Sequence, residues 1–176
     1  MSFWPLYRDD IVFSFRKQKE LAEKAFAQLA ADDDFFNQPG THSNSIAIIV
    51  KHLAGNLRSR WTDFLTTDGD KPGRDRDAEF IIEKIDTRAS LMARWDEAWA
   101  IVFESLNGLQ ERDWLHIITI RGEKHTVLQA IHRSLTHAAY HVGQIVYVAR
   151  LLKSDDWRWI TIPPGESKTY EKKYLS

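Results

Sequence analysis

Two histidines, His137 and His141, lie four residues apart in a segment whose apolar residues have helical spacing. At this spacing the two side chains share one helix face, about 5–6 Å apart at Cβ, which is close enough for both to bind one metal ion. His52 lies in another helical segment, where Ile48 and Ile49 share its apolar face. Three imidazoles from two helices would supply three nitrogen ligands and leave a coordination position for water or substrate. The pattern indicates a reactive metal site, and core histidines satisfied by hydrogen bonds are the alternative.

The residue types around this pair restrict the chemistry. The chain has no cysteine, so thiolate metal sites, disulfides and cysteine nucleophiles are excluded. Ala138 stands where zinc peptidases with the His-Glu-x-x-His motif carry their general base. Asn56, Gln144 and Tyr140 are the candidate neighbours that could orient a nucleophile at the metal. Tyr140 points about 100° away from the histidine that follows it, which favours a packing role.

Four amphipathic helical segments would position these side chains. They cover residues 10–30, residues 46–66 after capping side chains at 43–45, residues 78 or 86 to 106, and residues 126–153. Residues 114–120 are rich in β-branched side chains and residues 121–124 are typical of a turn, which predicts a short strand or hairpin. The simplest architecture is an all-α four-helix bundle with a short β excursion between the third and fourth helices.

Length and composition indicate one globular domain spanning residues 1–176. The tail from about residue 155 carries Trp157, Trp159 and Ile162, and we expect it to pack at least in part on the bundle. Lys and Arg number 24 against 25 Asp and Glu, so no net basic field would attract nucleic acid. The sequence shows no signal peptide and no apolar run that could span a membrane, so we expect a cytoplasmic protein.

A dense run of charged residues begins in the second helical segment and continues in the connector after it. It comprises Arg58, Arg60, Asp63, Arg74, Asp75, Arg76, Asp77 and Glu79. Arginine forks suit carboxylates and phosphates, so this run could bind an anionic substrate group. Thr66, however, would lie about 21 Å from His52 along a straight helix, which places the connector far from the metal unless it folds back. We therefore interpret the run as an ion-pair network, or as a contact with a second subunit.

The segments that carry the histidines resemble the DinB/YfiT-like superfamily of metal-dependent proteins. The resemblance rests on residues 45–56, SIAIIVKHLAGN, and on residues 137–145, HAAYHVGQI, and it extends over nearly the whole chain. It implies a four-helix bundle in which His52, His137 and His141 bind a divalent metal ion, commonly nickel or zinc. It also implies a homodimer. Some members of the superfamily are transferases or isomerases that use low-molecular-weight thiols.

Two functions are consistent with these observations. The first is a metal-dependent enzyme, either a thiol transferase or a hydrolase, with a small-molecule thiol or water as the nucleophile. The second is a non-catalytic metal-binding or dimeric interaction protein, and a metal-free bundle is a weaker third alternative. An open ligand position beside a substrate-sized cavity would favour the enzyme. A filled coordination shell, or a cavity plugged by Trp157 and Trp159, would favour the second function.

Overall fold

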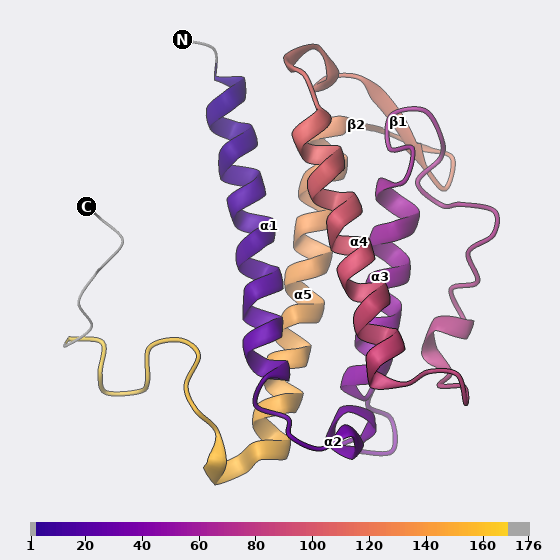
Figure 1. The fold of residues 1–176 in the computed structure, drawn as a ribbon. Helices are drawn as coiled ribbons and strands as arrows, with labels where there is room; N and C mark the ends of the chain where they lie inside the picture. The colour runs from indigo at the N-terminus through magenta and orange to yellow at the C-terminus, as the bar shows by residue number, and fades with distance from the viewer. Residues whose placement is uncertain (1–2, 169–176) are drawn as a thin grey trace.

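The computed structural model describes residues 3–168, and four long helices run side by side through it (Figure 1). These helices are α1 (Trp4–Phe26), α3 (Ile46–Trp61), α4 (Arg88–Gly108) and α5 (Val127–Lys153). A short helix, α2 (Asp32–Phe36), lies in the loop between α1 and α3, a segment for which the sequence predicted only a break. The structure confirms the predicted helical bundle.

The long helices begin where the sequence provides suitable residues. Ser45, Thr87 and Thr126 each accept a hydrogen bond from a backbone N–H in the first turn of the helix that follows, so these side chains are the N-caps of α3, α4 and α5. Helix α1 begins at Trp4, earlier than predicted. Pro5 is compatible with this start because proline is well tolerated in the first turn of a helix.

The connector between α3 and α4 is longer than the sequence predicted. Helix α3 ends at Trp61, since Thr62 is extended and Asp63 has a left-handed φ of 47°, and neither conformation continues an α-helix. Helix α4 begins at Arg88, and Ala78–Phe80 forms a separate 3-10 turn, η1. Residues 62–87 therefore form an irregular segment, called the connector below.

A two-stranded hairpin forms the predicted β excursion. Strand β1 (Ile117–Ile120) pairs antiparallel with β2 (Glu123–Thr126). Arg121 and Gly122 both have positive φ, 56° and 75°, as a two-residue turn between right-twisted strands requires. The carboxylate of Asp68 accepts the backbone N–H groups of both turn residues at 2.9 Å. The hairpin is thus attached to the connector.

Aromatic rings fill much of the core between the helices. Phe15 on α1 meets the rings of Trp61 and Trp99 edge to face, with centroid distances of 5.6 and 6.2 Å. Of the tail residues, Trp157 and Ile160 are partly buried against this core. Among the described residues, no helix is both long and apolar enough to cross a membrane. Helix α3 contacts both α5 and turn η1 of the connector.

Candidate metal centre

Helices α3 and α5 bring the three predicted histidines together. One ring nitrogen from each of His52, His137 and His141 lies within 4.8 Å of the other two. Nε2 of His137 is 3.2 Å from Nε2 of His141, and the ring centroid of His52 is 4.8 Å from that of His141. The three nitrogens are therefore close enough to hold one metal ion.

The ring of His52 is oriented by a carboxylate. Nδ1 of His52 lies 2.8 Å from Oε2 of Glu79. Because a carboxylate can only accept, Nδ1 carries the proton and Nε2 keeps its lone pair for a metal. Arg74 in turn donates to both oxygens of Glu79, from Nε at 2.7 Å and from Nη2 at 2.8 Å. Burial would raise the pKa of Glu79, but the hydrogen bonds from His52 and Arg74 outweigh it and hold this pKa below its usual value.

The ring of His141 is oriented in the same way by an amide. Its Nδ1 lies 2.8 Å from Oε1 of Gln144, one helical turn further along α5. Nδ1–H donating to this oxygen again leaves Nε2 unprotonated.

Of the other two predicted neighbours, Asn56 is buried on α3 and lines the cavity described below. Tyr140 is 64% exposed, so its ring does not take the packing role that the helical geometry favoured, and its centroid lies 5.0 Å from that of His141.

The third histidine, His137, remains neutral and incompletely bonded. Its Nδ1 is buried and has no hydrogen-bond partner among the described residues. Burial, together with the positive charge of neighbouring histidines and arginines, lowers the pKa of His137 to about 3. Burial also lowers the pKa of His141. Neutral imidazoles whose Nε2 atoms converge are suitable ligands for zinc or nickel, so the donor set fits a divalent cation.

These shifts predict that the metal-free protein loses stability as the pH falls from about 6.5 towards 3. Folded His137 stays neutral in this window, whereas the unfolded chain takes up a proton near pH 6.5, so acid favours the unfolded chain. His141 contributes in the same direction. Urea unfolding of chelator-treated protein at neutral pH and at about pH 5 measures the effect. The stability of the His137→Gln variant should depend less on pH. If it depended on pH as strongly as the stability of the parent protein does, His137 would not be the source of the effect.

The connector folds back onto this centre, so its predicted remoteness from the metal is wrong. Turn η1 places Glu79 against α3, where a Cβ on Gly55 would overlap the Glu79 carboxylate. The estimate along a straight helix failed because α3 ends at Trp61 and the chain then reverses. The ion pairs expected in this region are present as well. For example, the pair of Arg74 and Glu79, 2.7 Å apart, lies within the predicted run.

Glu79, Arg74 and Gly55 are the residues of this centre to which the sequence analysis gave no role at the metal. The charged run included Glu79 and Arg74, but only as members of an ion-pair network. A glycine inside a helix destabilises it by about 1 kcal/mol relative to alanine, and this cost was the available signal that something approaches α3 closely at Gly55.

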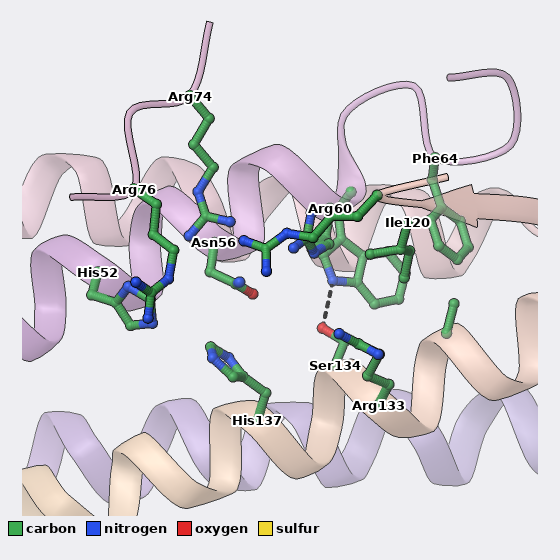
Figure 2. Close-up of a pocket in the computed structure, with 13 residues that line it drawn as sticks. His52, Asn56, Arg60, Phe64, Arg74, Arg76, Ile120, Arg133, Ser134 and His137 are labelled. Atoms are coloured by element: carbon green, nitrogen blue, oxygen red, sulfur yellow. Dashed lines mark hydrogen bonds between the residues drawn. The ribbon is translucent and has the colours of Figure 1, made fainter. Parts of the chain in front are cut away.

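A cavity of about 250 Å³ adjoins the histidines (Figure 2). His52 and His137 are in its wall, whereas His141 is not. Its remaining lining residues are Asn56, Arg60, Trp61, Phe64, Arg74, Arg76, Ile120, Arg121, Ala130, Arg133 and Ser134. Neither Trp157 nor Trp159 lines the cavity, so these two side chains do not plug it. Its volume is slightly below the roughly 300–1,000 Å³ that is typical of small-molecule sites.

Comparison with known proteins identifies one family and a similar solved structure. Residues 3–166 match the family described as "Protein of unknown function (DUF1572)". The crystal structure of the conserved protein of locus from Enterococcus faecalis has a TM-score of 0.62 to this chain at 17% identity, and the match covers 82% of this chain and 95% of that chain. At this identity the likeness concerns the fold alone. The curated proteins include no match.

Proposed function

The chain belongs to the DUF1572 family, and we propose that it is a metal-dependent enzyme of the DinB/YfiT-like superfamily in which His52, His137 and His141 hold one nickel or zinc ion. The observation that carries this proposal is the position of the histidines at the wall of a cavity. His52 and His137 line the cavity and His141, which clusters with them, does not. A cation held by all three would therefore have its free coordination side towards a space that a small molecule can enter.

The residues around the cation would have separate tasks. Glu79 and Gln144 hold His52 and His141 with Nε2 directed at the cation. The cation supplies Lewis acidity, which activates a nucleophile or polarises a substrate oxygen. Asn56 lines the cavity and can donate to or accept from a substrate group.

A thiol is the nucleophile that this cavity favours. No Asp or Glu is among its lining residues, so a water nucleophile would lack the carboxylate base that hydrolases commonly use. A thiol ionises near pH 8.5, and nearby arginines lower its pKa further, because they stabilise the thiolate. We therefore propose a thiol transferase in preference to a hydrolase. A non-catalytic metal-binding protein is the alternative.

We also propose that the protein acts as a homodimer. Tyr140, Tyr147 and Leu151 are exposed on α5, by 64, 70 and 51%. Tyr140 and Tyr147 are two helical turns apart, and Leu151 follows one turn later, so the three share one face. An apolar face of this kind is a suitable contact for a second copy.

Cobalt substitution tests the proposed function. Co²⁺ added to chelator-treated protein should bind at one ion per chain, and adding 2-mercaptoethanol should produce a sulfur-to-cobalt charge-transfer band. Ethylene glycol, which has no sulfur, is the control and should leave the spectrum unchanged. Cobalt that binds but does not respond to the thiol would support the non-catalytic alternative. Failure to bind cobalt at all would refute the metal centre.

A further inference from the structure

Arginines surround the cavity next to the histidines. Five of its lining residues are arginines, namely Arg60, Arg74, Arg76, Arg121 and Arg133. These arginines come from α3, the connector, the hairpin turn and α5, so segments far apart in the sequence meet here. Figure 2 shows Arg74 and Arg76 on the connector and Arg133 on α5. A cavity lined by charge of one sign concentrates ligands of the opposite sign.

Two of the arginines have a structural role. Arg60 and Arg121 donate to the two carboxylate oxygens of Asp70, at 3.0 and 3.2 Å. Arg74 is partly satisfied, since Glu79 accepts from its Nε and Nη2. Nη1 of Arg74 is buried without a hydrogen-bond acceptor, and it lies 3.6 Å from the nearer oxygen of Asp70. A donor left in this state is costly unless a ligand or water satisfies it.

The other two arginines, Arg76 and Arg133, are both exposed and have few or no partners among the described residues. Within residues 3–168, Arg133 takes part in no hydrogen bond or ion pair. Arg76 has a carboxylate neighbour in Asp77, but at 3.6 Å, and the Asp77 side chain is 96% exposed, so water screens the pair. The Arg76 guanidinium lies 5.1 Å from the centre of the Phe80 ring, which itself lies 4.8 Å from the ring of His52. The Phe80 ring thus lies near both the Arg76 guanidinium and the ring of His52, a candidate metal ligand.

The free arginines lie close to the metal centre. Arg133 and His137 are four residues apart on α5, which places their Cβ atoms about 5–6 Å apart on one helix face. An anionic group held by Arg133 would therefore lie about one helical turn from the cation. Trp61, Phe64 and Ile120 provide an apolar wall in the same cavity. The cavity thus has arginines on one part of its wall and apolar side chains on another, and both adjoin the candidate metal centre.

We propose that Arg76 and Arg133 bind a carboxylate or phosphate group of the substrate, which is a small organic acid with an apolar part. A guanidinium fork matches the two oxygens of either group. The volume of about 250 Å³ limits the ligand to a small molecule. The identification of this anion as part of a substrate rests on the proposed function. The anion site itself is made by the protein alone and does not require the metal.

Calorimetry on metal-free protein tests the site without interference from the cation. Phenylphosphonate is the probe, and benzyl alcohol is its uncharged counterpart. Phenylphosphonate should bind and benzyl alcohol should bind at least about tenfold more weakly, as expected when a charge-assisted hydrogen bond is missing. Arg133→Gln and Arg76→Gln should each weaken phenylphosphonate binding by about tenfold or more. Circular dichroism and thermal unfolding would verify that both variants are folded.

Arg112→Gln is the matched control, because it removes the same charge from a side chain that is 85% exposed and outside the cavity. It should leave phenylphosphonate binding unchanged. The proposal fails if phenylphosphonate binds no better than benzyl alcohol, or if Arg112→Gln weakens binding as much as Arg133→Gln. The two proposals can fail separately. Protein that binds phenylphosphonate but not cobalt keeps the anion site, and protein that binds only cobalt lacks it.

Discussion

Replacing His137 with alanine is expected to lower the affinity for zinc by more than about 100-fold, because the cation would lose one of three protein ligands. The same change should leave the fold intact. Among the described residues, His137 is only partly buried and its Nδ1 has no hydrogen-bond partner, so the only polar contact that truncation removes is the one of 3.2 Å between its Nε2 and Nε2 of His141. Competition with a chromogenic chelator would measure the affinity, and elemental analysis would measure the zinc bound per chain.

His132→Ala is the control for this experiment. His132 is exposed on the same helix, with its ring stacked 6.0 Å from that of Tyr7, and it is not among the three clustered histidines. This variant should bind zinc as the parent protein does. If His137→Ala retained the parent affinity, a centre made of these three histidines would be refuted. Loss of zinc in both variants would instead indicate a general effect on the helix.

Replacing Glu79 with alanine is expected to reduce both stability and metal affinity. The side chains of Glu79 and Arg74 are 9 and 6% exposed, so removing the carboxylate leaves a buried guanidinium without its main partner. A broken buried pair of this kind costs about 3–5 kcal/mol. Metal affinity should fall by about 10–100-fold, because the ring of His52 loses the acceptor that orients it. Urea unfolding of metal-free protein and zinc competition would measure the two effects.

Two further variants separate these effects. Glu83→Gln changes a connector carboxylate that is 65% exposed, and it should alter neither stability nor zinc binding. Gly55→Ala keeps both buried charges but places a methyl group where the Glu79 carboxylate lies, so we expect it to weaken zinc binding. If Glu79→Ala were destabilised yet bound zinc as tightly as the parent, Glu79 would stabilise the fold without orienting His52.

Under the proposed function, the cavity would combine substrate binding and metal chemistry in one space. One wall carries the imidazoles, and the connector and α5 contribute arginines around the rest. The connector therefore has two tasks, since Glu79 orients His52 and Arg76 faces the cavity. Because the connector both orients His52 and lines the cavity, a substrate bound in the cavity would affect the geometry of the proposed metal centre.

Local sequence determined the helical framework and the pairing of His137 with His141 on one helix face. The spacing of His137 and His141 places them on one face of any α-helix, and caps such as Ser45 and Thr126 set where α3 and α5 begin. The position of Arg133, one turn before His137, could have been derived by the same rule. Periodicity and capping depend on neighbours within a few residues, which is why the sequence alone was sufficient for them.

Only the tertiary structure decided what surrounds the histidines. Glu79 lies in the irregular connector, where it contacts His52 and packs against Gly55. No periodic pattern specifies the path of such a segment. Its path depends on buried ion pairs and on one close approach to α3, and these contacts join residues more than twenty positions apart. The charged run could therefore be recognised as a candidate anion site from its residue types. Its location beside the metal centre depended on a chain reversal that residue spacing does not encode.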